Sequence, residues 1–225
     1  MEKVLVIASG GLDSISMASK YLNDDLELIT FDYGQKGVKE LEVVKKFGEK
    51  FDKKVTVVDI QFMADLFGEN QLSGSVEIES SYTGSVVVPL RNAVFIQIAM
   101  VKAYTEGFDK VILGSHTDDI AMTDDTEFSY PDCSPQFFKA MQLAQDLGTF
   151  RDQGTVEIES ASTLGYSKSD LMKIGYENLG DFIFETWSCY KSDLLQCGDC
   201  ESCNNRKRFF DQVGITDLTS YHDYS

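Results

Sequence analysis

The sequence SGGLDS, at residues 9–14, follows an apolar segment near the start of the chain. Its two glycines let the backbone come close to a ligand, and successive N–H groups at a helix start form a pocket for anionic oxygens. A phosphate group is therefore the favoured ligand. From residue types alone, the alternative is an ordinary turn in which Ser9 or Asp13 caps the helix. We expect Gly11 to have no room for a side chain, because a Cβ branch would meet the phosphate and disfavour a positive φ.

Four cysteines lie close together near the other end of the chain, in a C-x7-C-x2-C-x2-C pattern formed by Cys189, Cys197, Cys200 and Cys203. Thiolates two residues apart can bind one ion, and four thiolates complete the tetrahedron of a structural zinc site. An iron–sulfur cluster is the alternative for the same ligands. We favour zinc because four ligands leave no open position and nothing else in the sequence indicates electron transfer. Cys133 is expected to be a free thiol.

Other polar residues come directly after apolar segments. Arg91 and Asn92 begin a helical pattern, and an arginine there opposes the helix dipole, which favours a phosphate or carboxylate ligand over a surface role. Asp118 and Asp119 follow a predicted strand and are typical of magnesium ligands. Two solvated loop acids are an equally good interpretation of the same pair.

Asp132 and Cys133 lie behind a proline-stiffened turn. The Asp132 carboxylate can accept the paired N–H groups of a guanine-like edge, or it can cap the helix that starts near Pro135, and residue types do not separate the two. No histidine is near Cys133 in sequence, so we favour a packing or substrate-contact role over a catalytic thiol.

The elements that would position these residues alternate along the chain. Apolar segments at 3–8, 26–31, 54–60, 110–115 and 154–160 are predicted strands, with helical patterns between them. This alternation predicts an α/β fold with a doubly wound, mostly parallel five-stranded sheet. Ligands in such folds bind at the carboxyl ends of the strands, where the SGGLDS loop also lies.

Two further segments carry structural expectations. Residues 91–107 are apolar almost all round, which predicts a well-buried helix. Residues 68–86 are rich in Gly, Ser and Glu, which predicts a long loop or small hairpin, placed where it could cover the site.

A helix is also predicted to begin after Ser167. Ser167 is its expected N-cap, with Asp170 three residues later as an acidic variant of the capping box. This helix carries Lys168 in its first turn and is expected to end near Gly180.

Composition narrows the class of protein. The chain has 225 residues and 43% hydrophobic content, which suits one domain with a small appendage. Its net charge of −17 disfavours stable binding to nucleic acid. The N-terminal residues lack a signal-peptide pattern, and no apolar run approaches the ~20 residues of a membrane span. Clustered cysteines fit metal binding in a reducing compartment, so we expect a cytoplasmic protein.

Taken together, several motifs resemble the 7-cyano-7-deazaguanine synthase family of the ATP pyrophosphatase, or PP-loop, superfamily. They are SGGLDS, FDYGQ, VPLRN, YPDC, SK before a helix, WSCY and C-G-x-C-x2-C-x2-R, and they are spread over nearly the whole chain. By this resemblance, ATP activates the carboxylate of 7-carboxy-7-deazaguanine as an adenylate, ammonia gives an amide, and a second ATP drives dehydration to the nitrile. The resemblance implies ATP, Mg²⁺ and Zn²⁺ as cofactors, an adenine nucleotide alpha hydrolase-like domain at 1–183, and a zinc-binding segment at 184–225.

The resemblance also implies roles for individual residues. The implied catalytic residues are Ser9, Asp13, Arg91 and Lys168. ATP contacts are implied for Ala8, Ser9, Gly10, Gly11, Leu12, Asp13, Ser14, Phe31 and Asp32. Substrate contacts are implied for Tyr33, Gln35, Arg91, Asn92, Asp119, Tyr130, Asp132, Cys133, Trp187 and Tyr190. Arg206 fits the arginine that follows the last cysteine of the family pattern.

Some positions depart from that pattern. Lys36 and Gly37 stand where the family usually has a basic pair with histidine, and Ser134 stands in place of an arginine. These differences concern side chains expected near the amine that accepts the activated substrate. They raise the alternative of a divergent ligase that joins the activated deazaguanine to an amine of a protein partner. The sequence GSHTDD at 114–119 is similar to tRNA-modifying relatives, which gives a second alternative that the negative charge opposes. The expected partner is a small-molecule substrate, and a homodimer stays open.

Overall fold

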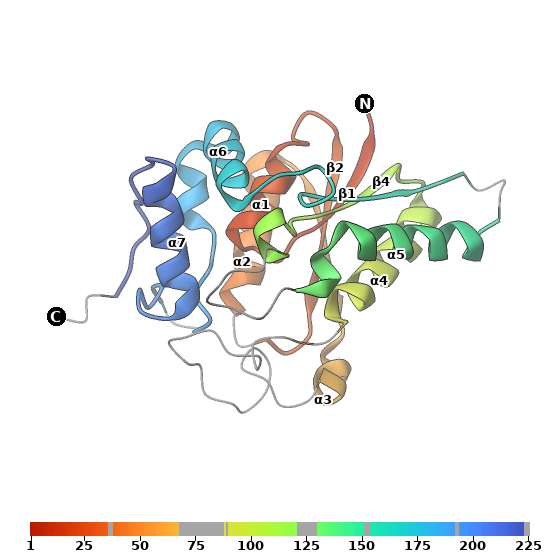
Figure 1. Cartoon of the computed structure of the whole chain (residues 1–225), viewed down its shortest axis with the longest axis horizontal. Coiled ribbons are helices and arrows are strands. Elements are labelled where there is room, and N and C mark those ends of the chain that lie inside the picture. Colours follow the sequence, from red (N-terminus) through yellow and green to blue (C-terminus); the bar gives the residue numbers. More distant parts are fainter. Residues whose placement is uncertain are drawn as a thin grey trace.

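The computed structural model describes residues 1–35, 38–67, 88, 90–120, 130–150, 154–191 and 194–222. Figure 1 shows a central sheet with helices on both sides. The loop expected at 68–86 and the departures at residues 36 and 37 lie outside the described residues. Within the described part of the chain, no helix is both long and apolar enough to cross a membrane.

The sheet has five strands, and every neighbouring pair is parallel. The strands are β1 (Lys3–Ile7), β2 (Asp25–Asp32), β3 (Lys54–Asp59), β4 (Lys110–Leu113) and β5 (Glu157–Ser160). Their spatial order is β3-β2-β1-β4-β5, so β2 and β3 lie on one side of β1, and β4 and β5 lie on the other. The carboxyl ends of β1 and β4 therefore flank the point where strand order reverses, where such sheets bind ligands. The predicted fold class is confirmed.

Seven α-helices are described: α1 (Leu12–Ser19), α2 (Val38–Phe51), α3 (Ala64–Phe67), α4 (Arg91–Glu106), α5 (Pro135–Gly148), α6 (Lys168–Leu179) and α7 (Glu201–Gln212). In Figure 1, α1 and α2 lie on one side of the sheet and α4 and α5 on the other, while α7 lies beyond α6. Short 3-10 segments at 61–63, 117–119, 131–133 and 180–185 connect them.

Alternate residues of β1 enter two separate cores. Val4 and Val6 pack in the core that α1 and α2 cover, and Leu5 and Ile7 pack in the core that α4 and α5 cover. Because both faces of the sheet are buried, the strand needs an unbroken apolar run rather than an alternating one.

Two sequence expectations need correction. Residues 91–107 do not form a helix buried all round, because the sheet covers only one side of α4 and Val101 is 68% exposed on another. The last strand begins at Glu157 rather than at residue 154, since its ladder with β4 starts where Glu157 pairs with Lys110.

The start of α6 matches its prediction. The Ser167 hydroxyl accepts the N–H of Asp170 at 3.2 Å, and the Asp170 carboxylate accepts the N–H of Ser167 at 2.9 Å, so the capping box is confirmed. Gly180 follows the last helical residue. Lys168 is thereby fixed at the first position of the helix.

Helix α6 packs closely on α1 at Gly175. A methyl group at this position would overlap the Ser16 side chain and press on Ile183. We predict that Gly175→Ala destabilises the protein by about 1–3 kcal/mol, the usual cost of overpacking a core, measured as a lower melting temperature. Gly148→Ala is the control, because nothing lies within 4 Å of its added methyl group. Equal melting temperatures for both variants would contradict the close packing of α1 and α6.

Candidate active site

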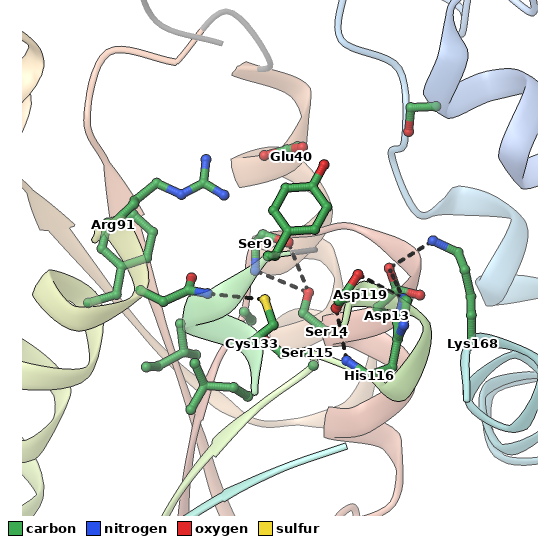
Figure 2. A pocket seen from close by; sticks show the side chains of 18 of the residues that line it. Ser9, Asp13, Ser14, Glu40, Arg91, Ser115, His116, Asp119, Cys133 and Lys168 are labelled. Carbon is green, nitrogen blue, oxygen red and sulfur yellow. Dashed lines mark hydrogen bonds and ion pairs between the residues drawn. The ribbon is translucent and has the colours of Figure 1, made fainter. Parts of the chain in front are cut away.

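A pocket of about 500 Å³ opens at the carboxyl ends of β1, β2 and β4. Its walls come from the SGGLDS loop, the start of α2, the start of α4, the loop after β4, and the helices α6 and α7. Figure 2 looks into this pocket and labels ten of its lining residues. Segments from both halves of the chain therefore meet at the switch point of the sheet.

The SGGLDS loop is held by backbone contacts and by one buried hydroxyl. Gly10 has φ +91°, and a Cβ there would overlap the backbone of Glu40 in α2. Ser14 accepts the N–H of Ser9 at 3.1 Å and donates to the Gly11 carbonyl at 3.2 Å. These contacts fix the curvature of the loop against α2.

The structure corrects two expectations about this loop. The positive φ belongs to Gly10, because Gly11 is extended at φ −72°. A Cβ at Gly11 would lie 3.2 Å from the Ser9 hydroxyl, and its clash with a phosphate stays a prediction. The alternative in which Ser9 or Asp13 is the N-cap is also wrong: Gly11 is the N-cap residue, and the Ser9 hydroxyl accepts the N–H of Gly11 rather than one inside α1. The start of α1 thus lies open toward the pocket, as an anion site requires.

Asp13 is the centre of a charged cluster on one side of the pocket. Lys168 Nζ donates to Asp13 Oδ2 at 3.1 Å, and His116 Nε2 lies 3.7 Å from the same oxygen (Figure 2). Burial alone would raise the pKa of Asp13, but Lys168 and His116 outweigh it and hold that pKa well below its usual value. Asp13 is therefore ionised at neutral pH. Its Oδ1 is buried and has no hydrogen-bond partner among the described residues, so it remains an acceptor for a cation.

The two aspartates after β4 also join this cluster, so they are not simply solvated loop acids. Asp118 Oδ2 accepts the N–H of Lys168 at 2.6 Å, and Asp119 Oδ2 accepts the N–H of His116 at 2.9 Å. Burial raises the pKa of Asp119. Burial alone would lower the pKa of His116, but the charges of Asp13 and Asp119 outweigh it and hold that pKa above its usual value. Asp118 and Asp119 thus anchor Lys168 and His116 around Asp13.

The opposite side of the pocket combines a cation with aromatic rings. Arg91 Nη1 donates to the Tyr33 hydroxyl at 3.2 Å, and the guanidinium carbon lies within 6 Å of the Tyr33 and Phe95 ring centres. Phe95 also stacks on Phe31, with ring centres 4.3 Å apart. Arg91 Nε is buried and has no hydrogen-bond partner within the described chain. This wall suits a flat heteroaromatic ring that carries an acidic group.

The Asp132 side chain lies beside the start of α4, where its Oδ2 accepts the N–H of Asn92 at 3.4 Å. It does not cap α5, because Ser134 is the N-cap and accepts the N–H of Phe137 at 3.2 Å. Ser134, which departs from the family pattern, thus has a structural role. Burial raises the pKa of Cys133 to about 12, with Asp119 adding to the effect, so this thiol is protonated and a poor nucleophile.

Most of the predicted site residues line the pocket, namely Ala8, Ser9, Asp13, Ser14, Phe31, Tyr33, Gln35, Arg91, Asn92, Asp119, Tyr130, Cys133, Lys168 and Tyr190. Trp187 is placed elsewhere, in the core, where its indole donates to the Cys189 carbonyl and its backbone N–H donates to the Gly10 carbonyl. Asp32 accepts from the Gly34 N–H and the Gln61 amide. The ligand contacts of all these residues stay predictions.

Sequence reasoning missed several lining residues, including Glu40, Ser115, Ser202, Asn205, Arg208 and Phe209. Four of them lie on α7, which follows the cysteine pattern and is far from the SGGLDS loop in sequence. The only sequence signal near them is the basic run at 204–208, and the sequence does not indicate where this helix packs. Tertiary packing alone brings them to the pocket.

The four cysteines of the C-terminal pattern form a buried cluster beside α7. Their sulfur atoms all lie within 4.8 Å of one another, and Cys197 Sγ is 3.9 Å from Cys203 Sγ. Sulfur atoms about 3.8 Å apart are expected for a tetrahedron with bonds of ~2.3 Å to the metal. Backbone N–H groups point at the Cys189 and Cys197 sulfurs, as they do around thiolate ligands. The cluster fits a metal ion.

Comparisons with known proteins match the chain over nearly its whole length. The chain matches the model of the family described as Queuosine biosynthesis protein QueC over residues 3–214. It is 33% identical to a 7-cyano-7-deazaguanine synthase of Thermoplasma volcanium, over 99% of this chain and 92% of the relative. It is 34% identical to 7-cyano-7-deazaguanine synthase 1 of Mesorhizobium japonicum, over 97% of this chain and 93% of the relative. A crystal structure of a predicted subunit of tRNA methyltransferase from Methanocaldococcus jannaschii covers 79% of this chain and 76% of its own, with 15% identity and a TM-score of 0.45, too low to carry an argument.

The contact between Gly10 and α2 generates a prediction. Gly10→Ala must move either the loop or Glu40, and a positive φ adds strain of about 1–3 kcal/mol. We expect a lower melting temperature and weaker binding of inorganic pyrophosphate, measured by calorimetry. Gly11→Ala, whose methyl group meets only the Ser9 hydroxyl, is expected to fold like the wild type. A Gly10→Ala variant with wild-type melting temperature and wild-type affinity for pyrophosphate would contradict the role of this contact.

Proposed function

The chain belongs to the QueC family of queuosine biosynthesis proteins, and from this premise we propose that it is a 7-cyano-7-deazaguanine synthase. The proposal rests on one observation above all: curated synthases align with 97–99% of the chain at about one-third identity. The reaction converts 7-carboxy-7-deazaguanine, ammonia and two ATP molecules into the nitrile, two AMP and two pyrophosphates. The enzyme is an ATP-dependent ligase.

In the first half of the reaction, a carboxylate oxygen of the substrate attacks the α-phosphorus of ATP and pyrophosphate leaves. The open start of α1 and the ammonium group of Lys168 can receive the negative oxygens of the departing pyrophosphate. Arg91 lies across the pocket, beside the aromatic wall, where its guanidinium can orient the substrate acid. Lys168 thus serves the side of the pocket that receives pyrophosphate, and Arg91 serves the side that receives the substrate acid.

Asp13 is the best candidate to hold Mg²⁺, because its unpartnered Oδ1 is a hard, ionised oxygen ligand. A magnesium ion bound there would neutralise phosphate charge and favour the departure of pyrophosphate. Asp119 lies in the same cluster, where a second carboxylate can support the first.

Zn²⁺ is the metal that we assign to Cys189, Cys197, Cys200 and Cys203, because four buried thiolates with no open position make a structural site. Its role is to hold α7 and the lining residues that α7 carries. Thiolate ligands need a reducing compartment, which supports a place in the cytoplasm. A homodimer and a protein acceptor gain no support from the comparisons and stay predictions.

The function is tested by incubating the pure protein with ATP, Mg²⁺, ammonium and 7-carboxy-7-deazaguanine. We expect the nitrile by mass spectrometry and two AMP for each nitrile formed. A Lys168→Met variant is the control, and it should lose most of this activity because it removes the cation beside Asp13. AMP release by the wild type without any nitrile would refute the proposed reaction.

The metal assignment gives a second prediction. Cys200→Ser should remove the zinc and melt the C-terminal segment at a lower temperature, because a structural zinc contributes folding free energy on the order of 10 kcal/mol. Zinc content is measured by atomic emission and unfolding by circular dichroism. Cys133→Ser, which changes a cysteine away from the cluster, should keep one zinc per chain. Full zinc content and unchanged melting in Cys200→Ser would rule out the assignment.

A further inference from the structure

Glu40 is a pocket residue to which the sequence motifs give no role. It lies in the first turn of α2, and its backbone packs against Gly10 of the phosphate loop. Its side chain lines the pocket, and Figure 2 shows it on the same side of the loop as Arg91, away from the cluster of Asp13 and Lys168. A carboxyl group is thus fixed between the loop and the wall that suits the substrate acid.

Among the residues that the structure describes, the Glu40 carboxyl group has no fixed partner. Within the described residues, no hydrogen bond or ion pair joins this carboxyl to another side chain. Arg91 of α4 and the Tyr33 hydroxyl after β2 are the charged or titratable groups that interact with it electrostatically, while Lys39 of its own helix pairs with Glu42 instead. Burial raises the pKa of Glu40 to about 7, and the Arg91 charge opposes this only in part.

The proposed function needs a base of this strength twice, so the inference rests on that function. At neutral pH most of the ammonia is present as ammonium, which cannot attack a carbonyl carbon until it loses a proton. Formation of the nitrile from the activated amide must also remove a proton from nitrogen. A base that works near pH 7 is best matched by a group whose pKa is close to that value.

Four other titratable groups of the pocket are less suited to this task. Asp13 is a weak base because Lys168 and His116 stabilise its charge. Asp119 accepts the N–H of His116, and Cys133 keeps its proton. Glu201 is occupied by the Tyr190 hydroxyl and the Asn205 amide. Among these groups, Glu40 combines a position between the loop and Arg91 with a carboxyl that has no hydrogen-bond partner in the described part of the chain.

We propose that Glu40 is the proton acceptor for both nitrogen steps of the reaction. In the first, ammonium gives one proton to Glu40, the resulting ammonia bonds to the carbonyl carbon of the acyl adenylate, the carbon–oxygen bond to AMP breaks, and the second proton leaves the nitrogen for water. In the second, after ATP has adenylated the amide oxygen and released pyrophosphate, the N–H proton passes to Glu40. The carbon–oxygen bond to AMP breaks and the C≡N bond forms. The open pocket lets water remove each proton from Glu40 between the two steps.

The test compares Glu40→Gln with Glu42→Gln. The first keeps the size of the side chain and the backbone contact with Gly10, and the second changes an exposed carboxylate on the same helix. Exchange of pyrophosphate into ATP in the presence of 7-carboxy-7-deazaguanine measures adenylation alone. Nitrile formation from ammonium measures both nitrogen steps. Hydroxylamine, a weakly basic amine that is neutral at pH 7, traps the adenylate as a hydroxamate without needing a base.

We expect Glu40→Gln to keep exchange and hydroxamate formation near the wild-type rates while nitrile formation falls by roughly 100-fold or more, the usual contribution of a general base. The ratio of wild-type to Glu40→Gln nitrile rates should grow as pH rises through about 7, where Glu40 loses its proton, and level off above it. Glu40→Asp, which keeps a carboxyl group, should recover part of the rate. Glu42→Gln should match the wild type throughout.

Equal nitrile rates for wild type and Glu40→Gln would overturn the proposal, and so would a loss of exchange and hydroxamate formation in that variant, because Glu40 would then serve adenylation. Failure of the proposed function looks different: the wild-type protein itself would form no nitrile, whether or not it exchanges pyrophosphate into ATP. The two outcomes are therefore distinguished in the same experiment.

Discussion

The contact between Gly10 and the first turn of α2 is the constraint on which the site depends. It exists because Gly10 adopts a positive φ and has no side chain between it and the Glu40 backbone. The Gly10 carbonyl also accepts the N–H of Trp187, which begins the segment leading to the cysteine cluster. One residue of the loop thus contacts both α2 and the C-terminal segment, and three distant parts of the chain are placed around one pocket.

The C-terminal segment completes the pocket through a buried arginine as well as through its cysteines. Arg206 is 1% exposed, and its guanidinium donates to the Thr186 and Ser188 hydroxyls and to the Ile183 carbonyl. Neutral acceptors satisfy the donors of this cation, which limits the cost of burying it. With one side of α7 fixed by Arg206 and the cysteines, the helix can present Arg208 to the pocket. The cysteine cluster and the pocket are therefore parts of one structure.

Local patterns in the sequence predicted the five strands, the capping box at Ser167 and the SGGLDS turn between β1 and α1, because strand period, N-cap chemistry and glycine spacing act over a few residues. The family resemblance was confirmed by the comparisons, which favour neither the protein-amine nor the tRNA alternative. Features that depend on packing were missed: the positive φ at Gly10, the placement of Asp132 beside α4, and the arrival of Glu40 and α7 at the pocket. Short sequence patterns do not indicate which helix will pack against a given loop.

The positive side chains of the pocket have a consequence for how a polyanion arrives. Arg91, Lys168 and Arg208 are gathered in the pocket of a chain whose net charge is −17. The same walls carry Asp13, Glu40, Asp118, Asp119 and Glu201, so an approaching nucleotide meets repulsion over most of the surface and attraction only where it contacts these cations directly. Dissolved salt screens interactions beyond about 8 Å at physiological ionic strength, so it weakens the distant repulsion more than the attraction at contact. Moderate ionic strength should thus assist capture of the nucleotide, the reverse of its effect on proteins that draw their ligands in from afar.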